Sequence, residues 1–212
     1  MGPTLNMIIA VIVSYLIGSI PFGYLAGKIV KGIDIRTTGS GNVGATNVFR
    51  SVGKTAGVVV LLADALKGVL AVMIATKIIP QPYTETLRIV SGVTAICGHN
   101  WTIFLKFKGG KGVATSTGVM LTLAPWATLT GLIVFVLAVF ISRYISVGSI
   151  LAASFLPFFV GLYDCGNYIL LYFSVVVAIL IDVRHIPNIK RLMAHTEHKF
   201  SFKKRPDSTD LK

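Results

Sequence analysis

Seven apolar segments constrain this chain more than any other feature of its sequence. They cover residues 5–27, 55–79, 86–103, 113–124, 126–142, 147–163 and 167–183. Most approach the ~20 residues that an α-helix needs to cross a bilayer, and 113–124 is the short one. Only 13% of the 212 residues are charged, which is about half the share in a soluble domain. The pattern predicts an all-α, polytopic integral membrane protein.

Residues 113–142 allow two interpretations, because they can form two spans or one long helix with a kink at Pro125. The distribution of Lys and Arg favours two. Seven spans place all the strongly basic connectors on one side of the membrane, whereas six would send Arg143 and the basic tail to the outside. We therefore expect seven transmembrane helices, with the N-terminus outside and the C-terminus in the cytoplasm.

The net charge of +12 does not indicate nucleic-acid binding. The basic residues lie in short connectors between apolar segments and form no continuous basic face. Their asymmetry places three polar loops together on the cytoplasmic side: Gly39–Arg50, Phe107–Thr115 and Arg184–Glu197. We expect residues 1–200 to form a single transmembrane domain, followed by a basic, disordered tail at 201–212.

The first loop, Gly39–Arg50, has the composition of an anion-binding site. Its glycines allow successive backbone N–H groups to converge on one point. Arg50 can hold two phosphate oxygens at once, and further donors are available from Ser40, Asn42, Thr46 and Asn47. For this motif taken alone, a glycine-rich connector between two helices is the alternative.

The second loop, Phe107–Thr115, places two lysines among three glycines directly before an apolar segment. Backbone donors, a positive helix end and mobile ammonium groups would meet there. Gly112 follows Lys111 where a Walker A loop requires Ser or Thr, which disfavours nucleotide hydrolysis but leaves phosphate binding open. The alternative is a flexible basic loop that touches lipid headgroups.

The third loop begins at the mouth of the last apolar segment, where His185 and Asn188 are three residues apart. They share a face if the backbone there is helical, a condition that Pro187 makes uncertain. His185 can act in proton transfer or as a hydrogen-bond donor, and a purely structural histidine is the alternative. No histidine or acidic spacing matches a zinc site, so we predict no metal and no cofactor.

Asp64 and Lys67 are also three residues apart, inside the second apolar segment. On a helix they would lie on one face. A charge inside a membrane span is costly and usually faces a partner or a polar cavity. Two alternatives remain open here: an internal ion pair that orients the helix, and a contact with a substrate.

Taken together, the motifs resemble those of the bacterial acyl-phosphate:glycerol-3-phosphate acyltransferases, the PlsY family. The matching stretches are S-G-N-V-G-A-T-N-V-F-R at 40–50, D-A-L-K-G at 64–68, G-H at 98–99, K-G-G-K-G-V-A-T at 108–115 and R-H-I-P-N-I-K-R-L at 184–192, with Glu197 after it. The resemblance runs from the first apolar segment to about Phe200. One departure is M-A-H-T-E at 193–197, which lacks the family's common glycine before the glutamate.

The resemblance implies a seven-helix enzyme that moves a fatty acyl group from acyl phosphate to the 1-hydroxyl of glycerol 3-phosphate, giving lysophosphatidic acid and phosphate. The resemblance and the composition of the loops together predict the roles of individual residues. The expected catalytic residues are Ser40, Arg50, His185 and Asn188, and the expected structural residues are Asp64, Lys67 and Glu197. The expected substrate-binding residues are Gly41, Asn42, Gly44, Thr46, Asn47, Gly109, Gly110, Lys111, Gly112 and Ser149.

The partners implied are the two substrates, the lipid bilayer and, through a functional link, an enzyme that forms acyl phosphate. The implied location is the bacterial cytoplasmic (inner) membrane, with the site facing the cytosol. A membrane transporter for a phosphorylated small solute is the alternative function. Such a transporter should contain two similar halves, and the sequence pattern of residues 39–50 does not recur.

Overall fold

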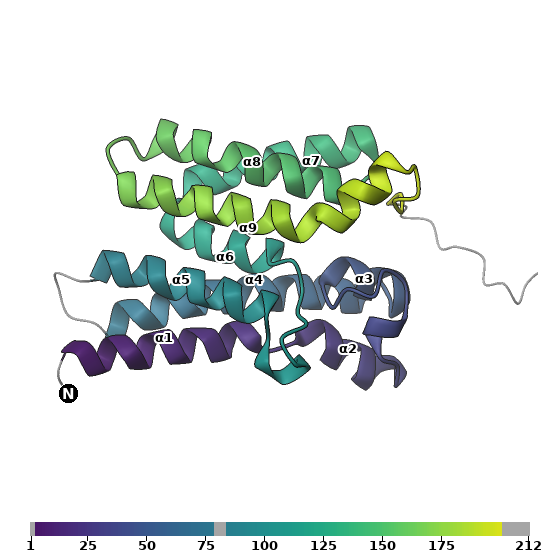
Figure 1. The fold of residues 1–212 in the computed structure, drawn as a ribbon, viewed down its shortest axis with the longest axis horizontal. Coiled ribbons are helices and arrows are strands. Elements are labelled where there is room, and N and C mark those ends of the chain that lie inside the picture. Colours follow the sequence, from purple (N-terminus) through teal and green to yellow (C-terminus); the bar gives the residue numbers. More distant parts are fainter. Residues whose placement is uncertain (1–2, 79–83, 201–212) are drawn as a thin grey trace, which may run out of the picture.

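The computed structural model of this chain describes residues 3–78 and 84–200, and within them every regular element is a helix (Figure 1). The expected tail at 201–212 lies outside the described residues. The elements in chain order are α1 (Pro3–Ser19), α2 (Phe22–Lys31), the 3-10 turn η1 (Ile35–Thr37), α3 (Ala45–Ser51), α4 (Lys54–Ile78), α5 (Thr84–Asn100), the 3-10 turn η2 (Ile103–Leu105), α6 (Val113–Leu123), α7 (Pro125–Ser142), α8 (Ile145–Tyr163) and α9 (Tyr168–Met193).

The long helices form two layers with α6 between them (Figure 1). In one layer α1, α4 and α5 pack together, and in the other α8 packs against both α7 and α9. The short helix α6 contacts α4 and α5 on one side and α7 and α9 on the other. The largest apolar core joins buried side chains of α4 to α9, among them Val72, Ile96, Val119, Leu156 and Val177.

The outer faces of the helices are strongly apolar, as expected for contact with lipid. Phe140 and Ile141, for example, expose 75% and 80% of their surface. Within the described ranges, five helical stretches are long and apolar enough to cross a membrane: Thr4–Lys31, Lys54–Lys77, α7, α8 and α9. Helices α5 and α6 have 17 and 11 residues, so the count of seven spans and the orientation of the termini stay predictions. The all-helical membrane architecture itself is confirmed.

Residues 113–142 form two separate helices, α6 and α7, and not one long helix, while two membrane spans there stay a prediction. Elsewhere the structure differs from the expected segments. The apolar segment 5–27 is broken at Pro21, which separates α1 from α2, because proline lacks an N–H and disfavours helical backbone in the preceding residue. Residues Ala45–Ser51 of the first loop are helical, and α9 continues through Pro187 to Met193.

Close packing between α4 and α6 depends on two glycines. A Cβ placed on Gly68 would collide with the backbone carbonyl of Thr115, and one on Gly118 would collide with the carbonyl of Ala65. Small residues of this kind let membrane helices approach closely. The contact fixes where α6 begins, and therefore where the loop before it lies.

We predict that Gly118→Ala destabilises the protein by about 1–3 kcal/mol, because the added methyl group forces α4 and α6 apart. The measurement is thermal unfolding of the detergent-solubilised protein. Gly161→Ala in α8 is the matched control, since its Cβ would find its nearest neighbour at 3.9 Å. Equal unfolding temperatures for the two variants would contradict the prediction.

Candidate active site

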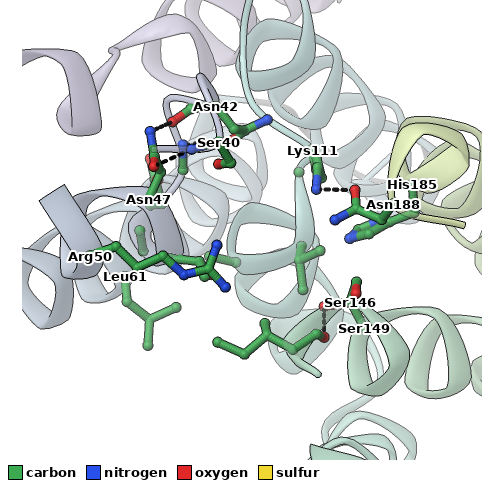
Figure 2. Close-up of a pocket in the computed structure, with 18 of the residues that line it drawn as sticks. Ser40, Asn42, Asn47, Arg50, Leu61, Lys111, Ser146, Ser149, His185 and Asn188 are labelled. Atoms are coloured by element: carbon green, nitrogen blue, oxygen red, sulfur yellow. Dashed lines mark hydrogen bonds between the residues drawn. The ribbon is translucent and has the colours of Figure 1, made fainter. Parts of the chain in front are cut away.

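Residues of all three polar loops line one cavity of about 140 Å³ (Figure 2). Arg50, Lys111 and Asn188, one from each loop, all line it, so the predicted convergence is confirmed. The other expected site residues that line the cavity are Ser40, Asn42, Gly44, Thr46, Asn47, Asp64, Gly112, Ser149, His185 and Glu197. Those that do not are Gly41, Lys67, Gly109 and Gly110.

Asn47 holds the first loop together. Its side chain is 1% exposed, and its amide nitrogen donates to the carbonyls of Ile35, Thr38 and Asn42 at 2.9–3.0 Å. Its amide oxygen accepts from the backbone N–H of Ser40 at 2.9 Å. The hydrogen-bonding capacity of this amide is therefore taken up by the loop itself. Asn47 stabilises the conformation of the loop that lines the cavity.

The remaining donors of the first loop are arranged around the cavity (Figure 2). The Asn42 side-chain oxygen accepts from the N–H of Gly44 at 2.8 Å. Ser40 is exposed at the rim. The guanidinium of Arg50 points toward the middle of the cavity and donates to the carbonyl of His198 at 3.3 Å. Together these groups can surround an anion.

The glycines of the second loop pack against the end of α5. The N–H of Gly109 donates to the carbonyl of Asn100 at 3.1 Å, and that of Gly110 to the carbonyl of His99 at 3.0 Å. Gly112 precedes α6 with a φ of +81°, a conformation that favours glycine. Since Gly109 and Gly110 have already donated their N–H groups, the donors left for an anion begin at Lys111.

Lys111 is mostly buried, and its ammonium group donates to the side-chain oxygen of Asn188 (Figure 2). Burial lowers the pKa of Lys111 to about 8, while the charge of Glu197 partly opposes this shift. Burial therefore makes the charged form of Lys111 costly. An arriving anion would offset that cost.

His185 and Asn188 lie on the same face of α9, because the helix is continuous through Pro187. The Nδ1 atom of His185 lies 2.8 Å from the carbonyl oxygen of Ile181. A carbonyl can only accept, so Nδ1 carries the hydrogen and the neutral ring presents Nε2 as an acceptor. The Asn188 amide connects Lys111 to Glu197, to which it donates at 2.8 Å.

Glu197 anchors the segment that follows α9. Its carboxylate accepts from Asn188, from Ser146 at 3.2 Å and from Arg191 at 2.6 Å. Burial would raise the pKa of Glu197, but the hydrogen bonds from Arg191 and Asn188 outweigh burial and lower it. The turn before it forms despite the missing glycine, with His195 at a φ of +56°. Glu197 therefore acts on the site through Asn188.

Asp64 and Lys67 form a buried ion pair at 2.7 Å. Lys67 also donates to the carbonyl of Ile20 at 3.0 Å, at the break between α1 and α2, where the N–H of Phe22 donates to the same carbonyl at 3.1 Å. His99 lies 2.9 Å from the Lys67 ammonium group. This geometry corresponds to the ion-pair alternative of the sequence analysis, with Asp64 at the edge of the cavity.

Three further polar residues that the sequence did not single out line the cavity: His99, Ser146 and Arg191. Arg184, Asn188 and Arg191 follow i, i+4, i+7 spacing, so a helix continued through Pro187 would have placed all three on one face. No local signal points to Ser146, since its partner Glu197 is 51 residues away.

Two apolar grooves adjoin the polar cavity and share Leu61 and Phe135 with it. One, of about 260 Å³, runs between α4, α6, α7, α8 and α9. The other, of about 590 Å³, is bordered by α3, α4, α7 and the start of α8. Cationic groups beside apolar grooves suit a ligand with a phosphate head and a hydrocarbon tail.

Comparisons with known proteins agree on one family. Residues 8–195 match the family model described as glycerol-3-phosphate acyltransferase. Glycerol-3-phosphate acyltransferase 2 of Moorella thermoacetica is 50% identical over 91% of this chain and 96% of its own length. The glycerol-3-phosphate acyltransferase of Geobacter sulfurreducens is 45% identical, over 92% of this chain and 98% of its own.

Two solved structures of PlsY, an integral membrane glycerol 3-phosphate acyltransferase, are also similar. The glycerol 3-phosphate form superposes with a TM-score of 0.85 at 38% identity, covering 92% of this chain and 96% of that one. The lysophosphatidic acid form gives 0.83 at 38% identity, covering 92% and 95%.

We predict that Asn47→Asp destabilises the protein by at least about 2 kcal/mol, because a carboxylate would face three carbonyl oxygens with no donor of its own. Thermal unfolding measures this effect. Asn42→Asp keeps the acceptor that Gly44 needs and should unfold at the wild-type temperature. If Asn47→Asp keeps the wild-type unfolding temperature, Asn47 does not hold the loop.

Proposed function

The chain belongs to the glycerol-3-phosphate acyltransferase family, and we propose that its acyl donor is an acyl phosphate. In this proposal the 1-hydroxyl of glycerol 3-phosphate receives the acyl group. The products are lysophosphatidic acid and inorganic phosphate.

The main support is the shape and charge of the site. Arg50 and Lys111 enter one cavity from different loops, as expected for a site that must hold two phosphorylated reactants. The apolar grooves at Leu61 and Phe135 give the acyl chain of the donor a place next to those cations. A soluble phosphorylated solute would need no such grooves.

In the proposed reaction the hydroxyl oxygen of glycerol 3-phosphate bonds to the acyl carbon, and the bond from that carbon to the phosphate oxygen breaks. Phosphate leaves with the electron pair, so no covalent intermediate on the protein is needed. Arg50, Lys111 and Ser40 hold phosphate groups and stabilise the charge that develops. Most of the acceleration comes from placing the hydroxyl beside the carbonyl.

Asn188 and His185 orient the attacking hydroxyl. Nε2 of His185 is free to accept a hydrogen bond from that hydroxyl, because Nδ1 is committed to Ile181. The hydroxyl proton leaves either to this nitrogen or to a substrate phosphate. Glu197 keeps the Asn188 amide turned toward Lys111.

We place the enzyme in the bacterial cytoplasmic membrane as one transmembrane catalytic domain, residues 1–200, with seven spans and the site facing the cytosol. The basic connectors at the end of the bundle that carries the site support this orientation. Acyl phosphate is a reactive amphiphile, so an enzyme that forms it is the expected functional partner.

Purified protein given acyl phosphate and labelled glycerol 3-phosphate, without coenzyme A thioesters, should form lysophosphatidic acid. Ser40→Ala, Arg50→Ala and Asn188→Ala should each lower kcat/KM by about 10²-fold or more, since each loses a group that contacts the reactants. Lys190→Gln, an exposed neighbour on α9, should keep wild-type activity. Product formed only from an acyl-coenzyme A donor would refute the proposed donor.

The pKa of Lys111 at about 8 predicts a basic limb in the pH profile. The ammonium form, which holds phosphate, exists below that pH and is lost above it. We therefore expect kcat/KM for glycerol 3-phosphate to fall about tenfold per pH unit above pH 8. Lys111→Arg keeps its charge at higher pH, so the fall in kcat/KM should begin at a higher pH than in the wild type. A wild-type profile that stays flat to pH 9.5 would contradict a required Lys111 cation whose pKa is lowered to about 8.

A further inference from the structure

Arg184 lies on α9 directly before His185 and contacts the glycine loop rather than the cavity. Its Nε donates to the carbonyl of Gly110 at 3.0 Å, and its Nη2 donates to the carbonyls of Gly110 and Gly109 at 2.6 and 3.1 Å. The guanidinium carbon is 5.7 Å from the centre of the Trp101 ring. The planar guanidinium is thus held in one orientation.

These contacts fix the direction of the peptide groups in the loop. In a planar trans peptide the C=O and the following N–H point in opposite directions. The Gly109 carbonyl points at Arg184, and the N–H of Gly110 correspondingly points away, at the carbonyl of His99. By the same geometry, the Gly110 carbonyl held by Arg184 turns the N–H of Lys111 away from Arg184.

The N–H groups of Lys111 and Gly112 have no acceptor among the residues that the structure describes. They are followed by the first N–H groups of α6, which have no intrahelical acceptor. Lys111, Gly112 and the first two residues of α6 all line the cavity. The loop therefore has consecutive backbone N–H groups available to a ligand, while the carbonyls of Gly109 and Gly110 accept hydrogen bonds from Arg184.

We propose that Arg184 is a positioning residue for phosphate binding. By binding the carbonyls of Gly109 and Gly110, it keeps the backbone N–H of Lys111, the first of these consecutive donors, turned toward the anion. Because Arg184 shares α9 with His185 and Asn188, it also sets the distance between the loop and the groups that orient the hydroxyl. This role rests on the proposed function, since it assigns phosphate to the second loop.

The test compares binding of inorganic phosphate, the expected product, to detergent-solubilised wild type and variants by isothermal titration calorimetry. Arg184→Lys keeps the positive charge but loses the guanidinium, which donates through both Nε and Nη2. Arg184→Gln keeps one amide donor and has no charge. Arg88→Lys is the matched control, because Arg88 also donates to a backbone carbonyl, that of Thr122, on α6 beyond the cavity. Thermal unfolding is recorded for each protein.

We expect both Arg184 variants to bind phosphate at least tenfold more weakly, with unfolding temperatures no lower than that of Arg88→Lys, and Arg88→Lys to bind as wild type does. The KM for a phosphorylated substrate should rise more than kcat falls. Wild-type affinity in Arg184→Lys would leave only a charge effect and overturn the proposal. The proposal would also be overturned if both Arg184 variants unfolded at a lower temperature but their folded molecules bound phosphate with wild-type affinity.

The two proposals fail in different experiments. Phosphate binding is measured without an acyl donor, so its outcome does not depend on which donor the enzyme uses. If the wild type does not use acyl phosphate, the proposed acyl donor is wrong. The phosphate-binding comparison of the Arg184 variants can still be interpreted.

Discussion

The loops before α3 and before α6 are stretches of non-helical backbone at the end of this bundle, and their buried polar groups must be satisfied within the protein. An unpaired backbone group in such surroundings costs several kcal/mol. Asn47 meets this requirement in the first loop by bonding to four backbone groups. Arg184 and the carbonyls at the end of α5 meet it in the second. The loops are thereby shaped before any ligand arrives, which is what electrostatic catalysis by fixed donors requires.

Helix α9 connects the parts of the site. One face of it carries Arg184, which holds the glycine loop, and Asn188, which meets Lys111. After the helix ends, Glu197 returns to bond with Asn188, and the backbone N–H of Phe200 reaches the carbonyl of Arg143 at 2.7 Å. A single rigid element thus relates the glycine loop to His185 and Asn188, the groups proposed to orient the hydroxyl. Acyl transfer between two bound substrates depends on that relation, because misplacement of a reacting group by about 1 Å can cost about 10²-fold in rate.

Much of this arrangement could be predicted from the sequence. The apolar segments gave the fold class, and the basic connectors indicated that the three loops share one end of the bundle. The errors lie at prolines and in glycine-rich backbone. Pro21 divides the first segment into α1 and α2, whereas Pro187 leaves α9 continuous. The same residue type interrupts one helix and lies inside another, and no local pattern in the sequence distinguishes the two outcomes.

The sequence by itself determined the all-helical membrane architecture and which hydrogen-bond donors the polar loops contain. Only the tertiary structure decided how those donors are used. Asn47 and Arg50 both appear in the sequence as donors to an anion, yet one amide is consumed by the loop while the guanidinium points into the cavity. The physical reason is that a hydrogen bond is set by distances of about 3 Å. Such distances arise between residues like Ser146 and Glu197, far apart in the chain, only after the helices have packed.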